Sequence, residues 1–359
     1  MTVTKGNGLK KHDAKQQENA DPTFQKLSEE EIRPEKLRAG QEAAFARDVL
    51  RLQSRKDEFV EVHCPACNSA SATFALSKYD MHYQQCSSCN TLYMSPRPSP
   101  EIMADYYTNS ENYQYWSKYI FPATEATRRE KLHTIRLKRI QDYCEQYSVP
   151  QGMLLEVGPG FGTFSALAQE SNTFKRVTAV EPTPELAEAC RERGVDVIEK
   201  RFEDLGNSLP PVDVLVAFEV IEHLFEPLLF VQKASKIVRP GGLLILTCPN
   251  GLGFEVQVLR ELSPSIDPEH VNLFNPDAIS RMVEQNGFEV LDVATPGKLD
   301  AEYVHDAAIK DTIDLSKQLF LKQLLLDEWD KLCLPFQQFL AENQLSSHMW
   351  LVAKNHGAY

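Results

Sequence analysis

The chain has 359 residues, of which 42% are hydrophobic, so it can form one large domain with a real core and a second, smaller domain. Its formal net charge of −13 argues against a nucleic-acid partner, because neutralising phosphates requires clustered Lys and Arg, and a small-molecule substrate fits better. No apolar run approaches the ~20 residues of a membrane span, and the polar N-terminus lacks the apolar core of a signal peptide. We therefore expect a cytoplasmic protein without a membrane span.

Residues 1–60 are predicted to form a flexible leader. They are rich in Lys, Glu, Gln and Asp, and they have few large apolar residues and no sustained period. Such a segment cannot bury enough surface to offset the entropy of ordering. A helix is predicted at most around residues 41–52.

Four of the eight cysteines form two Cys-x-x-Cys pairs, which are Cys64 with Cys67 and Cys86 with Cys89. This spacing lets four thiolates surround one tetrahedral zinc ion, whereas a redox site needs only one such pair. Because four cysteines close the coordination shell and leave no position for a catalytic water, the predicted zinc site is structural. Residues 61–98 are therefore predicted to form a zinc ribbon, and a disulfide framework is not expected.

Residues 99–147 mix aromatic and charged side chains at roughly helical spacing, which predicts helices that pack on the next domain. The aromatic stretch from Tyr106 to Tyr119 has two interpretations. It is either a lid over a ligand or the packing face of a helix.

From Met153 onward, short apolar runs alternate with helical patterns, which is typical of a doubly wound, mostly parallel α/β sheet of seven strands. Residues 148–296 and 345–359 are assigned to this domain. Amphipathic helices are predicted for the insert, residues 297–344, either as a cap over the substrate or as a contact in a homodimer. The predicted strands are 153–157, 176–181, 195–198, 212–218, 243–248, 288–293 and 348–353.

Three glycines, Gly158, Gly160 and Gly162, follow the first strand of this sheet, at a strand-to-helix turn where a ligand can approach the backbone. The turn departs from the dinucleotide fingerprint because Thr163 replaces its third glycine and Pro159 lacks a backbone donor. The carboxylate of Glu156 would repel a diphosphate and attract a cationic ligand. A phosphate-free nucleoside with positive charge, such as S-adenosylmethionine, is therefore favoured over a nicotinamide dinucleotide.

Glu181 stands at the end of the second strand, about twenty residues after the turn, where a carboxylate can accept both ribose hydroxyls of a nucleoside. Pro182 restricts Glu181 to an extended conformation and so helps to hold the carboxylate at the tip of the strand.

The chain resembles the class I S-adenosylmethionine-dependent methyltransferases, in their UbiG-like branch, over about residues 137–293 and the last strand. The resemblance implies a Rossmann-like fold in which Phe202 and Glu203 flank the adenine, while Phe218 and Glu219 line the methionine end. For both phenylalanines, packing in the core is the alternative interpretation. The motifs that carry the resemblance are residues 156–162, 179–181, 202–205, 218–223 and 238–242.

Methyl transfer is an in-line displacement that needs an aligned nucleophile and often a base. Two Glu-His pairs, Glu222 with His223 and Glu269 with His270, follow the fourth and fifth strands and leave the carboxyl edge of the sheet. His270 is the preferred base, and the alternative for His223 is that it orients a loop or caps a helix.

Sugar C-methyltransferases with an N-terminal cysteine-rich module are also similar. They place a Glu-His pair and a further histidine in matching loops, which implies roles for His270 and His223. The resemblance implies a sugar, a nucleotide sugar or a glycoconjugate precursor as the acceptor. Two alternatives remain: an RNA or protein methyltransferase that uses the ribbon as a reader, and a non-catalytic binding module of the same fold.

Overall fold

The computed structural model describes residues 27–206 and 209–357, and its centre is a seven-stranded sheet in the order β10-β11-β8-β7-β4-β5-β6. The strands from β8 to β6 pair in parallel, whereas β11 is antiparallel to both β8 and β10. The predicted doubly wound, mostly parallel sheet is therefore confirmed. The strands are β4 (Met153–Val157), β5 (Arg176–Val180), β6 (Asp196–Ile198), β7 (Val212–Phe218), β8 (Val238–Pro249), β10 (Phe288–Ala294) and β11 (His348–Asn355).

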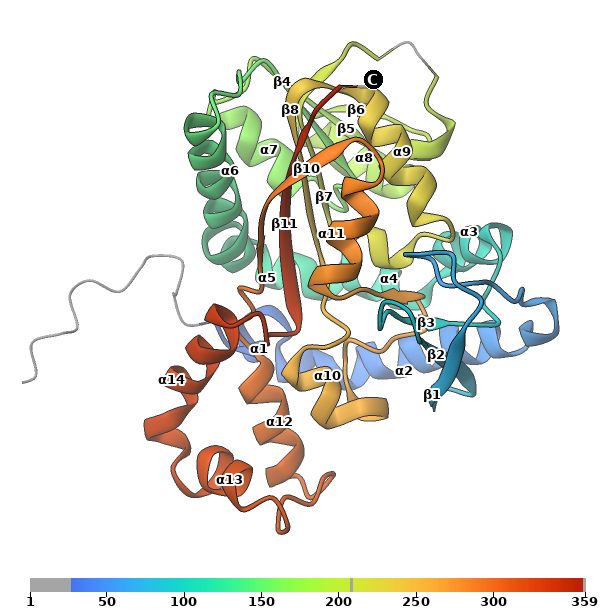
Figure 1. The fold of residues 1–359 in the computed structure, drawn as a ribbon, viewed down its shortest axis with the longest axis vertical. Helices are drawn as coiled ribbons and strands as arrows, with labels where there is room; N and C mark the ends of the chain where they lie inside the picture. Colours follow the sequence, from blue (N-terminus) through green and yellow to red (C-terminus); the bar gives the residue numbers. More distant parts are fainter. Residues whose placement is uncertain (1–26, 207–208, 358–359) are drawn as a thin grey trace, which may run out of the picture.

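Helices cover both faces of this sheet because its central strands are apolar on both sides. Every residue of β4 and β7 is buried. Leu155 contributes to a core on the side of α9 and α11, and its neighbour Leu154 contributes to a second core on the side of α6 and α7, as expected for alternating side chains (Figure 1). These and the remaining helices of the domain are α6 (Thr134–Gln146), α7 (Thr163–Glu170), α8 (Pro184–Glu192), α9 (Pro227–Ile237), α10 (Phe254–Leu259) and α11 (Pro276–Glu284).

The cysteine module forms a small antiparallel sheet that includes a strand from the large domain. The order of this sheet is β1-β2-β3-β9, with β1 (Ala72–Lys78), β2 (Met81–Cys86), β3 (Leu92–Met94) and β9 (Asn272–Leu273). Leu92 pairs with Leu273, and Tyr93 pairs with Asn272. The module is thus joined edge to edge with the segment that follows His270.

The expectation of a flexible leader is wrong for the described residues before the module. They form α1 (Glu29–Ile32) and the 19-residue helix α2 (Glu35–Gln53), which begins before the predicted start at residue 41. The helix buries only a few residues, among them Ala44, Asp48 and Leu52, and this narrow stripe is too sparse to stand out as an amphipathic period. Residues 1–26, the other part of the predicted leader, lie outside the described residues.

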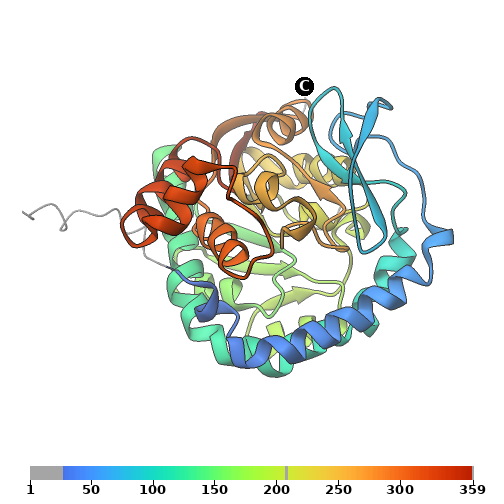
Figure 2. The same ribbon diagram turned by 90° about the horizontal axis from the view of Figure 1, so that it is seen from below.

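A helical segment follows the module, as predicted for residues 99–147. It consists of α3 (Pro100–Asn109), α4 (Glu111–Tyr115), α5 (Phe121–Arg128) and α6, with π-helical turns at Trp116–Ile120 and Arg129–His133. Figure 2, which views the molecule from below, shows α2 running beside this segment toward the strands of the module.

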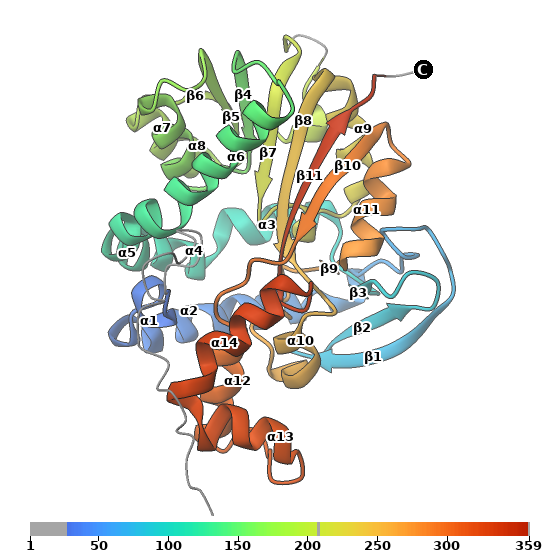
Figure 3. The same ribbon diagram turned by 60° about the vertical axis from the view of Figure 1, so that its left-hand side comes forward.

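The insert is helical, as the sequence predicts, and packs around Val304 and Leu325 in a small core that also includes Leu259 of α10. It contains α12 (Asp300–Ile309), α13 (Leu319–Lys322), a π-helical turn (Gln323–Asp327) and α14 (Trp329–Glu342). Figure 3 shows that the insert, α2 and the cysteine module all lie toward the carboxyl ends of β7 and β8. No described helix combines the length and the apolar character that crossing a bilayer requires.

Asp48 connects α2 to the start of α4 and is only 1% exposed. Its carboxylate accepts hydrogen bonds from the Ser110 hydroxyl at 2.6 Å and from the backbone amides of Glu111 and Asn112 at 3.0 and 2.9 Å. A carboxylate at this position satisfies donors that the helix itself leaves free and is favoured by the helix dipole.

We predict that Asp48→Ala lowers the free energy of unfolding by about 1–3 kcal/mol, because it removes a charged cap and leaves buried donors unpaired. Denaturant unfolding measures this loss. Arg47→Ala is the matched control, since Arg47 also bonds to α4, through Glu111, but both side chains are about half exposed. Its cost should stay below about 1 kcal/mol, and equal effects of the two substitutions would contradict the assigned role of Asp48.

Candidate active site

The turn after β4 places three glycines in the left-handed region, with φ values of 68° at Gly158, 54° at Gly160 and 77° at Gly162. A Cβ at Gly158 would lie 2.6 Å from a methyl group of Val220, and one at Gly162 would lie 2.8 Å from the sulfur of Cys190. At Gly160, by contrast, a Cβ would meet no atom within 4 Å. Two of the glycines therefore permit close packing, and the third faces open space where a ligand can approach the backbone.

Two buried carboxylates flank this turn. Glu156 at the end of β4 accepts a hydrogen bond from the Ser165 hydroxyl, and Glu181 after β5 accepts one from the Thr183 amide at 2.9 Å. Burial raises the pKa of each to about 7, and these hydrogen bonds oppose the rise only in part. Both groups are thus poised to become fully ionised when a cation or a hydroxyl donor approaches.

Glu219, just after β7, lies in a network of donors and has the positive φ of 56°, which is uncommon for a residue other than glycine. Its Oε1 lies 2.8 Å from Nε2 of His348, 2.5 Å from the Thr247 hydroxyl and 3.4 Å from the guanidinium of Arg136. Burial alone would raise the pKa of Glu219, but His348, Arg136 and Thr247 outweigh it and hold the pKa well below its usual range. Glu219 therefore remains an anion, and its side chain is 39% exposed.

Arg136 was not predicted from the sequence, because it lies within a helix with many charged residues. The structure places its guanidinium over the ring of Phe218, 4.5 Å from the centroid, with only 17% of the side chain exposed. A cation held between Glu219 and an aromatic face is well placed to receive a carboxylate.

The aromatic residues predicted near the cofactor also pack in the core. The Phe202 ring lies 4.8 Å from that of Phe230, and the Phe218 ring lies 4.9 Å from that of Phe164. Glu203 is exposed in the same 3₁₀ turn as Phe202 (Phe202–Asp204). These contacts agree with the packing interpretation and leave the predicted adenine contacts as a proposal.

The structure brings together three of the four residues predicted to carry the chemistry. One candidate ligand atom from each of Glu222, His223 and His270 lies within 4.8 Å of the others, and the two imidazole rings meet edge to face. Nδ1 of His270 is 2.9 Å from the carbonyl oxygen of Ser265. Because a carbonyl only accepts, Nδ1 carries a proton, so in the neutral imidazole the free lone pair is on Nε2.

The other two members of this cluster are held in their neutral forms. Burial and the neighbouring His270 lower the pKa of His223 to about 3, and its Nδ1 lies 3.2 Å from the Tyr107 hydroxyl. Burial and the charge of Glu219 raise the pKa of Glu222 well above its usual range. Neither carboxyl oxygen of Glu222 has a hydrogen-bond partner among the described residues, so the cluster has room for a proton or for a divalent cation.

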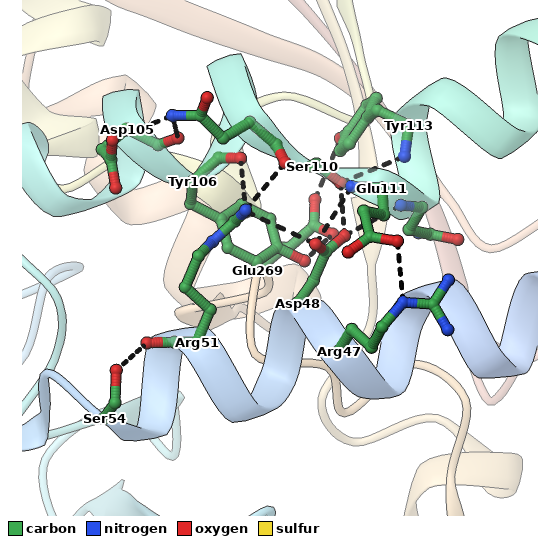
Figure 4. Close-up of polar contacts among 12 residues, drawn as sticks. Arg47, Asp48, Arg51, Ser54, Asp105, Tyr106, Ser110, Glu111, Tyr113 and Glu269 are labelled. Carbon is green, nitrogen blue, oxygen red and sulfur yellow. Dashed lines mark hydrogen bonds and ion pairs between the residues drawn. The ribbon is translucent and has the colours of Figure 1, made fainter.

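Glu269, the fourth predicted residue, contacts helices that the sequence did not link to it. Its two oxygens accept hydrogen bonds from the hydroxyls of Tyr106 at 2.8 Å and Tyr113 at 2.9 Å (Figure 4). Burial and Asp267 raise the pKa of Glu269 to about 8. The close-up also shows Asp48 of α2 beside these tyrosines, so α2, α3 and α4 form one support for the loop that carries His270.

The four paired cysteines meet at one point. The sulfurs all lie within 4.8 Å of one another, with 3.5 Å between Cys67 and Cys86 and 3.6 Å between Cys64 and Cys89. Both pairs end in the same type of turn, since the asparagines that follow them, Asn68 and Asn90, have φ values of 57° and 58°. Such a donor set fits a tetrahedral metal ion.

Comparison with known proteins supports the interpretation of the large domain. Residues 128–293 match the family described as a methyltransferase domain. A probable S-adenosylmethionine-dependent methyltransferase of Mycolicibacterium smegmatis is 29% identical over 162 residues, which cover 45% of this chain and 59% of the relative. A ubiquinone biosynthesis O-methyltransferase of Xylella fastidiosa is 30% identical over 130 residues, covering 34% of this chain and 52% of that protein.

The chain thus spans little more than half the length of these relatives. Among solved structures, an S-adenosylmethionine-dependent methyltransferase from Clostridium acetobutylicum is similar at a TM-score of 0.45 and 10% identity, covering 67% of this chain and 99% of that one. The family match, the sequence relatives and the strand order lead to the same assignment. Residues 128–293 belong to a methyltransferase domain of the class I, S-adenosylmethionine-dependent type.

Proposed function

We propose that the protein transfers a methyl group from S-adenosylmethionine to a small-molecule acceptor. The observation that carries the proposal is the open glycine turn between two carboxylates of raised pKa, Glu156 and Glu181. When bound, the cofactor supplies an electrophilic methyl group on a sulfonium. A cationic nucleoside without phosphates suits this acidic turn, and a dinucleotide would be repelled by it.

Each end of the cofactor has a proposed partner in this chain. Glu181 would accept the ribose hydroxyls, and Arg136 would bind the carboxylate of the methionine portion. Glu156 and Glu219 would attract its ammonium and sulfonium charges. Phe202 and Glu203 would border the adenine, as the family resemblance implies.

His270 is the proposed base. Its Nε2 has a free lone pair because the Ser265 carbonyl fixes the tautomer, and it would accept the proton that an acceptor hydroxyl loses as the new bond to the methyl carbon forms. His223 and Glu222 would keep the neighbourhood of His270 neutral, and Glu269 would hold the loop in place through Tyr106 and Tyr113.

A sugar, a nucleotide sugar or a glycoconjugate precursor is the proposed acceptor class. The pairing of β3 with β9 supports a small acceptor, because it makes the cysteine module part of the wall next to His270 and not a separate reader of RNA or protein. We further propose that the four-cysteine site binds structural zinc. The amide of Ser88 pointing at the Cys86 sulfur, at 3.4 Å, is a donor typically found beside a metal-bound thiolate.

We predict that Gly160→Arg weakens binding of S-adenosylhomocysteine by about 100-fold or more, equivalent to ~2.7 kcal/mol, because the side chain fills the open space at the turn. Isothermal titration calorimetry measures the affinity, and metal analysis should still find the bound zinc. Gly194→Arg controls for backbone strain, since Gly194 also has a positive φ, 78°, and an open neighbourhood. Retained binding in the Gly160 variant would place the cofactor elsewhere.

Cofactor affinity should rise between pH 5.5 and 7.5. Glu156 and Glu181, with pKa values raised to about 7, are mostly protonated at the lower pH and mostly ionised at the higher one. Since the cofactor favours the ionised form, each group can contribute up to about 20-fold in the dissociation constant of S-adenosylmethionine. Titrations of wild type and Glu181→Gln across this range test the effect, which the variant should reduce. A flat or falling affinity in the wild type would rule out the proposed roles.

His270→Ala should lower turnover by about 10²–10⁴-fold while changing cofactor affinity less than about twofold, because a base acts in the chemical step. Release of S-adenosylhomocysteine with a panel of sugar nucleotides measures turnover. His82→Ala, on the exposed side of β2, is the control. Unchanged turnover in the His270 variant excludes His270 as the base.

Loss of wild-type activity after dialysis against EDTA, with zinc retained and activity restored by Mg²⁺ or Mn²⁺, would instead identify the Glu222, His223 and His270 cluster as a cation site.

A further inference from the structure

Cations gather beside the proposed active site although the protein is strongly acidic overall. Arg128 and His133 lie on the helical segment that leads to Arg136, and Arg33 lies at the end of α1. The guanidinium groups of Arg33 and Arg128 both lie over the ring of Trp116, 5.8 and 5.1 Å from its centroid. Burial, followed by the charges of Arg136 and Arg128, lowers the pKa of His133 to about 3, so this histidine is neutral and the positive charge comes from the two arginines. We call Arg33, Arg128 and His133 the cationic cluster.

Among the described residues, the cluster has too few carboxylates and hydrogen-bond acceptors to pair all of its polar groups. Arg128 donates to the Thr124 hydroxyl at 3.0 Å and to the Ile32 carbonyl at 2.7 Å, and no carboxylate of residues 27–206 or 209–357 lies within ion-pair distance of it. Nδ1 of His133 and Nε of Arg33 are buried without a hydrogen-bond partner. Arg33 has only a long contact with Glu29, at 3.8 Å, and Glu29 also pairs with Arg38.

Other cations on the same segment have partners of their own. Lys131 pairs with Glu31, Arg129 with Glu170, and Arg136 with Glu219. Among the described residues, Arg128 therefore has no carboxylate to balance its charge, and Arg33 has only the long contact with Glu29. Burial, followed by the charges of Arg33 and Arg136, lowers the pKa of Arg128 to about 10. Like charges held together away from water cost free energy unless an anion binds between them.

The position of the cluster distinguishes it from the cofactor site. Arg128 precedes Arg136 by eight residues on a nearly continuous helical segment, a separation of about 12 Å at ~1.5 Å per residue. If Arg136 binds the carboxylate of the cofactor, Arg128 lies two turns away and is left to bind a different anionic group, with His133 between the two. A distance of this order instead matches a sugar ring whose far end carries a phosphate.

We propose that Arg33, Arg128 and His133 form a subsite for a phosphate or diphosphate group of the acceptor. The proposal rests on the proposed methyl transfer and specifies its substrate class. Guanidinium groups bind phosphate oxygens through paired hydrogen bonds, and the flat ring of Trp116 keeps both guanidiniums in place. Attraction of a cationic cofactor to the glutamates, and of an anionic acceptor to the cluster, would orient the two molecules relative to each other.

Calorimetry with inorganic pyrophosphate and with uridine diphosphate glucose, on the zinc-loaded protein saturated with S-adenosylhomocysteine, tests this subsite. Both probes should bind, and methyl glucoside, which has no phosphate, should not. Arg128→Gln should weaken both probes by about tenfold or more, and Arg33→Gln should weaken them in the same direction. Lys138→Gln removes one charge from an exposed position on α6 and should change either affinity less than about twofold.

Measuring the binding of S-adenosylhomocysteine to every variant distinguishes a failure of the subsite proposal from a failure of the proposed function. If it binds normally and neither phosphate probe binds the wild type, or if Arg128→Gln and Lys138→Gln bind the probes alike, the subsite is excluded while the methyltransferase proposal stands. Binding of pyrophosphate without the nucleotide sugar would also exclude it, because the site would then not accept the phosphate of a sugar acceptor. Absence of S-adenosylhomocysteine binding in the wild type would contradict the proposed function itself.

Discussion

The geometry of the site depends on one constraint, the placement of several carboxylates at the edge where the parallel strands end. A buried carboxylate is costly unless hydrogen bonds or opposite charges stabilise it. Each glutamate here meets that requirement differently, and the difference sets its protonation state. Glu219 has Arg136, His348 and Thr247 as partners and remains ionised. Glu269 has two tyrosine hydroxyls, and Glu222 has no hydrogen-bond partner among the described residues. One edge thus contains both a permanent anion and a neutral acid.

The helical segment from α4 to α6 supplies the opposite charge. Arg136 reaches Glu219 from this segment, whereas Arg128, two turns earlier, has no carboxylate partner in the described part of the chain. The edge is therefore divided into an acidic part near the glycine turn and a basic part near Trp116. This division explains how a chain with a net charge of −13 can present positive charge to a ligand. The location of the charged side chains decides this, and the net charge of the whole chain does not.

Local patterns in the sequence predicted the features that are determined by residues close together in the chain. Apolar runs located the strands of the large sheet to within a few residues, and the glycine turn, Glu156 and Glu181 were found because their order along a strand-turn-helix unit is characteristic. The sequence also identified the two Glu-His pairs, and the structure brings Glu222, His223 and His270 together. The predicted roles of these residues in binding and catalysis remain predictions.

What the sequence did not reveal depends on contacts between distant segments. Arg136, Asp48 and the tyrosine partners of Glu269 are ordinary residues of helices, and only the packing of those helices gives them a function. Asp48 lies 62 residues before the Ser110 that it binds, and Tyr106 lies 163 residues before Glu269. No periodicity or motif encodes such pairs. Because α2 buries few residues, the sequence pattern revealed only part of this helix, which supports the site.

The connection between the cysteine module and the catalytic loop links metal binding to the position of His270. Tyr93 of β3 pairs with Asn272, two residues after His270, and the carbonyl of Cys89 accepts a hydrogen bond from Asn275 at 2.8 Å. Asn275 in turn caps α11 through the Ala278 amide. Four thiols at such short separations attract one another only weakly, so the proposed metal ion would supply the attraction that holds this geometry. An ion bound there would therefore fix the loop after β8 from one side while Tyr106 and Tyr113 hold Glu269 from the other, so the module would act as a wall of the proposed active site.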